Sequence, residues 1–213
     1  MMQNKRFRKR NKMPPKPKFT KEEIVQAALK IAADKGMKAL TSRELGASLG
    51  SSARPIFTVF SGMDEVYTEV RKAAMKRFEG YAKKAECYSP VFKQIGLQMI
   101  LFAAEQPKLY RILFMSENAE AKTFDDIFAT LGDVADLCVD VIQRDYDLSR
   151  EDAMMLFKHL WIYTYGVGAL IATGTCRFEP DEIQDMLSRE FVGMLSLIKS
   201  GKAKNCTTLP QKN

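Results

Sequence analysis

Apolar residues recur at helical spacing along most of this chain. After the capping-box pair Thr20 and Glu23, Ile24, Ala28 and Ile31 share one face, and a glycine follows where a helix would end. The same criteria, with Ser, Thr and Pro as start signals and Gly as stop signals, predict nine helices. Their ranges are 20–36, 42–49, 53–59, 61–86, 89–106, 107–115, 124–142, 149–174 and 180–199. With no strand pattern or repeat, the prediction is an all-α fold.

Helix length changes along the chain, and this change predicts the domain organisation. Three short helices form an N-terminal head at 19–62, and the longer helices form a bundle at 63–200. The segment 1–18 is rich in Lys, Arg and Pro without a helical period, which predicts a disordered basic arm. Residues 201–213 are expected to be a flexible tail.

Positive charge is concentrated at the N-terminus. The chain carries +7 overall, but residues 1–18 carry +8, residues 19–60 carry +2, and the remainder carries −3. A local basic region of this kind indicates a nucleic-acid contact surface in the first 60 residues. For the arm taken alone, a solvated tail or an expression remnant is the alternative.

Several classes of chemistry find no support in the sequence. The four cysteines are far apart and His159 is the only histidine, which argues against a zinc site, a disulfide framework or another metal. No nucleophile motif or acid cluster suggests an enzyme, and no cofactor is expected. The longest apolar run, 160–172, is too short to span a bilayer, and no signal peptide precedes the head, so we expect a cytoplasmic protein.

The spacing of the second and third short helices is that of a helix-turn-helix, with Gly50, Ser51 and Ser52 as the turn. In that geometry the second helix enters the major groove of DNA. Candidate DNA contacts are therefore Ser52, Ala53, Arg54 and Thr58, and Arg54 can pair bidentately with guanine. Other small three-helix bundles can share this spacing.

A longer motif sharpens the prediction. It comprises Phe19-Thr-Lys-Glu-Glu-Ile24, Ala27-Ala28, Gly36, Leu40-Thr41, Glu44-Leu45-Gly46, Leu49-Gly50, Ile56-Phe57 and Phe60. The motif resembles the N-terminal signature of the TetR family of transcriptional regulators. The resemblance implies that Thr41, Ser42 and Arg43 face DNA phosphates, that Arg54, Phe57 and Thr58 lie on the exposed side of the recognition helix, and that Ile56 and Phe60 are packing residues.

The chain departs from the family pattern at three positions. Phe57 replaces the usual Tyr, Val59 the usual His, and Met63 a common Lys, so three polar groups able to meet phosphates are missing. Pro55 removes one further backbone donor. The basic arm is a plausible substitute, because phosphate neutralisation dominates such affinity.

The C-terminal half contains an all-round apolar helix rich in small residues. Gly166, Gly168 and Ala172 in the predicted helix 149–174 permit close helix approach. The family resemblance places a homodimer interface in the last two helices, at 149–199. His159 is expected to be a satisfied core or interface residue.

Aromatic side chains in the same half are candidates for lining a ligand cavity. We expect them among Phe102, Tyr110, Phe114, Phe128, Trp161 and Tyr165. Phe92, Met99 and Met155 belong to the same wider set, and the alternative is that all of these residues are simply core.

Together these features predict a ligand-responsive repressor. Its partners would be a near-palindromic double-stranded DNA operator, a second copy of the chain and a small apolar effector that releases the DNA. The alternative is a helical DNA-binding dimer without an effector, either a constitutive regulator or an architectural protein.

Overall fold

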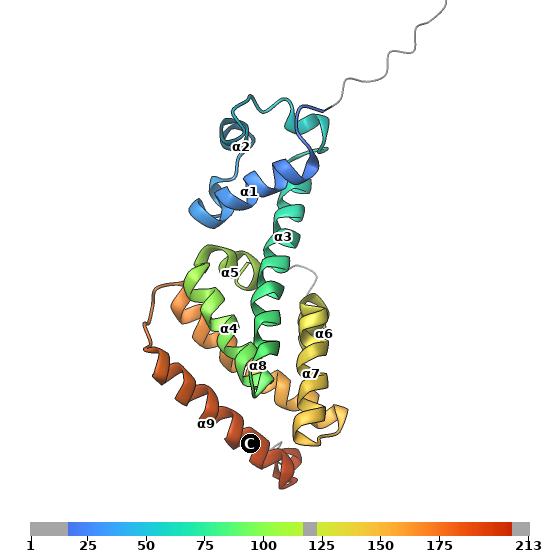
Figure 1. Ribbon diagram of the computed structural model, residues 1–213, viewed down its shortest axis with the longest axis vertical. Coiled ribbons are helices and arrows are strands. Elements are labelled where there is room, and N and C mark those ends of the chain that lie inside the picture. The colour runs from blue at the N-terminus through green and yellow to red at the C-terminus, as the bar shows by residue number, and fades with distance from the viewer. Residues whose placement is uncertain (1–16, 117–122, 206–213) are drawn as a thin grey trace, which may run out of the picture.

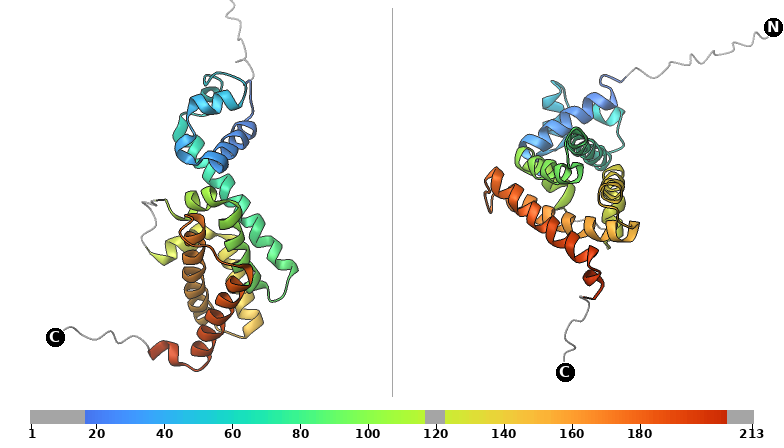
Figure 2. Two further views of the ribbon diagram at one scale, coloured as in Figure 1. Left: turned by 90° about the vertical axis from the view of Figure 1, so that its left-hand side faces the viewer. Right: turned by 60° about the horizontal axis from the view of Figure 1, so that its bottom comes forward.

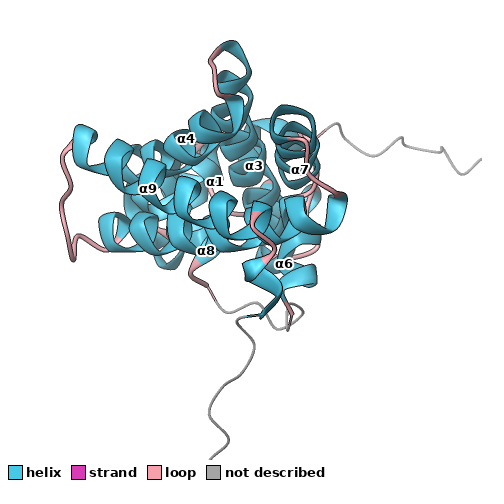
Figure 3. Ribbon diagram, turned by 90° about the horizontal axis from the view of Figure 1, so that it is seen from below, coloured by secondary structure: helices cyan, strands magenta, loops and turns pink. Residues whose placement is uncertain are grey.

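The computed structural model describes residues 17–116 and 123–205, in which all regular structure is helical (Figures 1 and 3). The expectation of an all-α fold is thus confirmed. The α-helices are α1 (Lys21–Lys35), α2 (Ser42–Ser48), α3 (Met63–Lys84), α4 (Val91–Glu105), α5 (Pro107–Phe114), α6 (Phe124–Leu131), α7 (Asp133–Tyr146), α8 (Arg150–Ala172) and α9 (Pro180–Lys199). Short 3-10 helices are η1 (Met37–Ala39), η2 (Ile56–Thr58), η3 (Ala85–Cys87) and η4 (Lys202–Asn205). The basic arm, except for its last two residues, lies outside the described residues, as does most of the C-terminal tail.

Local capping chemistry determines where α1 begins and ends. Thr20 and Glu23 form the reciprocal capping box, with the Glu23 amide donating to Thr20 Oγ1 at 3.1 Å. Gly36, at a φ of 85°, ends the helix in a conformation that side chains disfavour. At α2 only half of a capping box forms. The Glu44 amide donates to Thr41 Oγ1 at 3.2 Å, but the Glu44 carboxylate accepts from Lys35 Nζ at 2.6 Å instead of reaching back to Thr41.

The predicted third helix, 53–59, is wrong in type. Only the 3-10 segment η2 forms, between turns. Pro55 explains this, because the residue before a proline is driven out of the α region, so a helix cannot start before Pro55. The turn at Ser61 then leaves too few residues for a regular α-helix, and α3 starts at Met63, with Gly62 as its N-cap.

The predicted helix 124–142 is also wrong, because it is two helices. Gly132 adopts a φ of 52°, which breaks the backbone between α6 and α7. Apolar residues continue at helical spacing across the break, with Leu131 and Val134 both buried, so periodicity alone conceals it. α7 then runs to Tyr146, four residues beyond the expected end.

The head and the bundle share one helix. The view in Figure 1 shows α1 and α2 at one end of the molecule and α3 running from them along the bundle. α3 packs against α1 in the head and against α4 in the bundle, while α5 packs against α1. α4 contacts α3, α5, α7, α8 and α9, so it is the central helix of the bundle.

Aromatic rings fill the centre where α3, α4 and α5 meet. Phe78 of α3 packs edge-on against Phe102 and Phe114, with centroid distances of 5.5 and 5.2 Å. Tyr81 packs edge-on against Phe102 at 5.2 Å. Edge-to-face pairs of this kind fix ring orientation as well as burying area. Phe78 therefore anchors the middle of α3 in the bundle.

Candidate ligand pocket and DNA-binding surface

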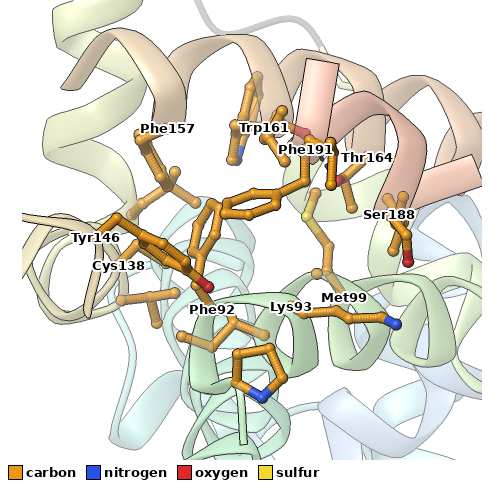
Figure 4. A pocket seen from close by; sticks show the side chains of 18 of the residues that line it. Phe92, Lys93, Met99, Cys138, Tyr146, Phe157, Trp161, Thr164, Ser188 and Phe191 are labelled. Carbon is orange, nitrogen blue, oxygen red and sulfur yellow. Dashed lines mark hydrogen bonds between the residues drawn. The ribbon is translucent and has the colours of Figure 1, made fainter. Parts of the chain in front are cut away.

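The bundle encloses a cavity of about 220 Å³ between α3, α4, α7, α8 and α9 (Figure 4). Its walls are mainly aliphatic and aromatic, which suits an apolar ligand. The lining residues are Phe78, Pro90, Phe92, Lys93, Ile95, Gly96, Met99, Leu131, Val134, Cys138, Tyr146, Phe157, Leu160, Trp161, Thr164, Leu187, Ser188, Phe191 and Val192.

Few polar atoms line the interior. The Thr164 hydroxyl is satisfied, since it donates to the Leu160 carbonyl at 2.7 Å. Burial raises the pKa of the Cys138 thiol to about 12, because the thiolate would lose its hydration. The indole nitrogen of Trp161 is buried, and none of the described residues offers it a hydrogen-bond partner. An unsatisfied buried donor costs about 1–3 kcal/mol, so this nitrogen is a site where a bound acceptor would be favoured.

The cavity opens to solvent between the start of α4 and the middle of α9. Pro90 and Val192 line it and are exposed, Val192 at 59%. Lys93 and Ser188 are partly exposed lining residues from the same two helices, and Figure 4 shows their polar ends on one side of the ring of side chains. The Ser188 hydroxyl is engaged, because it donates to the Gln184 carbonyl at 2.6 Å.

Of the six residues expected from sequence to line a ligand pocket, Trp161 lies in this cavity and the others lie outside its lining. Phe102 and Tyr110 are fully buried core, and Phe128 packs against Phe157 at 5.5 Å. In the wider set, Phe92 and Met99 line the cavity, whereas Met155 does not. Sequence reasoning missed residues such as Leu131 and Phe191, whose contribution depends on how distant helices pack.

Two tyrosines tie α5 to α8 beside the cavity. Tyr110 Oη donates to the Tyr165 carbonyl at 3.0 Å, and Tyr165 Oη donates to the Phe114 carbonyl at 3.0 Å. Burial raises the pKa of Tyr110, with a smaller contribution from Tyr165. Trp161 stacks on Tyr165 with a centroid distance of 5.3 Å, so the cavity wall touches this pair.

Gly168 and Gly166 lie on different faces of α8 and have different neighbours. Gly168 is buried against Tyr110, and a Cβ there would lie 2.5 Å from the Tyr110 hydroxyl oxygen, so this glycine makes room for the tyrosine ring. A Cβ at Gly166 would meet nothing within 4 Å. Gly166 instead lies on an outer face with His159, Ile162 and Leu170, and the last two are 51% and 40% exposed. His159 is exposed, which excludes the core as its place, and its expected place in an interface stays a prediction.

The head has the close turn that a helix-turn-helix needs. A Cβ on Gly46 would lie 2.8 Å from the carbonyl carbon of Ser52, so only glycine permits this contact between α2 and the next segment. The Ser51 amide donates to the Gly46 carbonyl at 2.9 Å. Lys18 Nζ donates to Ser51 Oγ at 3.0 Å, which fixes the end of the arm to the turn. As expected, Ile56 and Phe60 are buried packing residues.

The residues expected to contact DNA are distributed over one end of the head. Thr41, Arg43, Ser52, Arg54, Phe57 and Thr58 are exposed, Ser42 and Ala53 partly so. Thr41 Oγ1 accepts from the Glu44 amide, and the Thr58 hydroxyl donates to the Pro55 carbonyl at 2.6 Å. Within the described residues, Arg43 and Arg54 form no ion pair or hydrogen bond. Their charges are therefore available to an anionic partner.

The bundle is similar to a known family of domains. Residues 92–194, which supply α4 to most of α9, match the family model described as "Tetracyclin repressor-like, C-terminal domain". The C-terminal domain of the chain therefore belongs to the TetR family. No curated protein matches the chain.

Solved structures of TetR-family regulators share the fold. A TetR-like transcriptional regulator from Rhodococcus sp. RHA1 superposes with a TM-score of 0.57 at 17% identity, covering 85% of this chain and 96% of that one. A protein described as a TetR-family transcriptional regulator from Mesorhizobium loti MAFF303099 has a TM-score of 0.54 at 18% identity, covering 83% and 95%. At these identities the likeness is one of fold.

Across residues 17–116 and 123–205, no three His, Cys, Asp or Glu side chains gather as metal ligands would. In those same ranges no helix is both long and apolar enough to cross a bilayer.

Proposed function

We propose that this TetR-family protein is a dimeric repressor that binds a near-palindromic operator and releases it when a small apolar molecule occupies the cavity. One observation carries the proposal. Phe78 lines the cavity and belongs to α3. This helix follows the segment 53–59, which is called the recognition segment because it holds the expected base contacts. A ligand that displaces Phe78 therefore acts on the helix that positions the DNA-binding residues.

The head supplies the DNA contacts in this proposal. Arg54, Phe57 and Thr58 project from the recognition segment into the major groove, where Arg54 pairs with a guanine. Arg43 at the start of α2 meets the phosphate backbone, which positions the head without reading sequence. The basic arm adds phosphate neutralisation beside the turn, since Lys18 is held against Ser51.

Dimerisation through α8 and α9 would pair two such heads. The outer face of α8 exposes Ile162 and Leu170, and α9 exposes Leu197 at 41%. Gly166 and Gly193 have open space where a side chain would stand, so a partner helix could approach closely there. A two-fold dimer presents two recognition segments to successive major grooves, about 34–36 Å apart.

Two routes would connect the cavity with the head. The first is α3 itself, which carries Phe78. The second is α5, because Trp161 stacks on Tyr165, whose hydroxyl is bound to the Phe114 carbonyl at the end of α5. α5 packs on α1, and Lys108 Nζ donates to the Asp34 carbonyl across that contact. A ligand shifts the DNA equilibrium only if it prefers one arrangement of these helices.

The decisive experiment selects an operator from random DNA with the full-length protein and then titrates it with apolar ligands. Fluorescence anisotropy of the operator should report a loss of affinity of about 5–150-fold on ligand binding. A ligand that binds the protein but leaves operator affinity unchanged would favour the constitutive regulator instead. Failure to enrich any DNA sequence would overturn both the ligand-responsive repressor and the constitutive regulator.

A further inference from the structure

Two polar groups of the cavity lining, one at the opening and one in the wall, indicate what kind of ligand the cavity binds. Lys93 at the opening is the charged residue of the lining, and Trp161 in the wall presents an unsatisfied donor. We propose that the effector is an apolar carboxylic acid whose carboxylate lies beside Lys93 and whose body carries an oxygen acceptor that meets Trp161 Nε1. This proposal names the ligand class of the same cavity and so rests on the proposed function.

Lys93 has the properties of a carboxylate anchor. In the described part of the chain, no carboxylate pairs with it and no hydrogen bond involves its amine, whereas Lys21, Lys35 and Lys72 all form ion pairs. Its neighbour at the opening, Ser188, has its hydroxyl proton engaged by Gln184. An anion arriving at the opening would therefore find an unneutralised cation there.

Trp161 points to a second polar feature of the ligand. Its ring is held between Phe124, at a centroid distance of 5.7 Å, and Tyr165, at 5.3 Å. Figure 4 shows its nitrogen on the side facing the other lining side chains. An indole N–H only donates, so its complement is an acceptor such as a ketone oxygen.

The orientation follows from the cost of burying charge. Among the described lining residues, none in the interior is a cation that would pair with a carboxylate, so the ionised group must stay at the opening beside Lys93. The apolar chain then extends inward between Phe92, Phe191 and Leu160. The volume of about 220 Å³ is below the roughly 300–1,000 Å³ of pockets for drug-sized molecules, which favours a short chain.

Trp161 is the only tryptophan of the chain, so its fluorescence reports binding directly without DNA. The full-length protein is titrated with decanoate, decanol and decylamine. Decanoate should bind about ten-fold more tightly than decanol, and decylamine more weakly still, because only the carboxylate pairs with Lys93. Lys93→Met, which keeps the apolar stem, should remove the preference for decanoate, whereas Lys76→Met on exposed α3 surface should retain it. Equal affinity for the acid and the alcohol would overturn the proposal.

The internal acceptor is tested with oxodecanoates that place the ketone at successive carbons, measured by calorimetry. One isomer should bind about five-fold more tightly than decanoate, and Trp161→Phe should remove that gain while retaining the preference for acid over alcohol. If every isomer binds more weakly than decanoate, the assignment of Trp161 is overturned. These measurements are separate from operator release: tight carboxylate binding without DNA release would contradict the proposed function and leave the ligand class standing.

Discussion

The hydroxyl oxygen of Tyr110 lies where a side chain on Gly168 would begin, with 2.5 Å between that oxygen and the ideal Cβ position. Tyr110 is fully buried and its hydroxyl donates to Tyr165, so it has little room to move. We expect Gly168→Ala to lower the free energy of unfolding by about 1–3 kcal/mol. The measurement is urea denaturation followed by circular dichroism.

Gly80→Ala is the matched control for that substitution. Gly80 is an exposed residue of α3, outside the proposed dimer interface, and a Cβ there would meet nothing within 4 Å. Alanine there should stabilise the helix by up to about 1 kcal/mol. Equal losses in the free energy of unfolding for the two variants would show that the contact with Tyr110 does not determine which side chains position 168 tolerates.

Arg54 and Arg43 should differ in what they contribute to DNA binding. Arg54→Ala should cost about 1–3 kcal/mol on the selected operator and relax discrimination at one base position. Arg43→Ala should weaken selected and random DNA alike, because a phosphate contact carries no sequence information. Competition binding with both DNAs measures the two effects. If Arg54→Ala lowers the affinity for both DNAs equally, Arg54 contacts only phosphate.

The basic arm should determine salt dependence. Removing residues 1–16 deletes seven of the arm's eight Lys and Arg residues while keeping Lys18 and its bond to Ser51. Each lost phosphate contact should flatten the slope of log affinity against log salt by about 0.9 and leave the preferred sequence unchanged. A truncated protein with the full slope and full affinity would show the arm to be inert.

The outer face of α8 should control assembly. Ile162→Glu places a charge on that face and should yield a monomer in sedimentation at micromolar concentration, since burying an unpaired charge is costly. Leu101→Glu is the control, because Leu101 is also an exposed aliphatic residue, at 40%, but lies on α4, outside the proposed interface. A dimer that survives Ile162→Glu would place the interface elsewhere.

The free energy of unfolding should decrease at alkaline pH because of the buried thiol of Cys138. Its pKa is raised by burial from 9.0 to about 12 in the native state, so the unfolded chain releases this proton first as pH rises. The contribution of the neutral Cys138 thiol to the free energy of unfolding is complete below pH 9. It is lost at about 1.4 kcal/mol per pH unit between the unfolded and the native pKa. Cys138→Val should flatten this dependence in urea titrations from pH 8 to 11, whereas Cys87→Ser, which removes an exposed thiol, should not.

Local chemistry explains which parts of the fold could be predicted. The starts at Thr20, Ser149 and Pro180, and the end at Gly36, depend on groups within a few residues of one another, and the structure has each of them. The break at Gly132 could not be foreseen, because a glycine inside an apolar period is compatible with a continuous helix.

The cavity was harder to predict than the head. Tyr110 and Trp161 look alike as amphipathic aromatics in the sequence, yet Tyr110 is sealed in the core and Trp161 lines the cavity. The difference arises from the close approach at Gly168 and from how α9 lies over α8, which are contacts between residues distant in sequence. Residue type alone does not encode them.

The continuity of α3 has a mechanical consequence for a dimer. From Met63 to Phe78 the helix rises about 22 Å, at 1.5 Å per residue. A tilt of about 10° around Phe78 would carry the Met63 end sideways by about 4 Å, which is one third of the width of a major groove of about 12 Å. Two-fold symmetry applies the same displacement to both heads in opposite directions, so the distance between them would change by up to about 8 Å. A tilt of this size would thus be enough to move the two recognition segments out of register with the helical repeat of DNA.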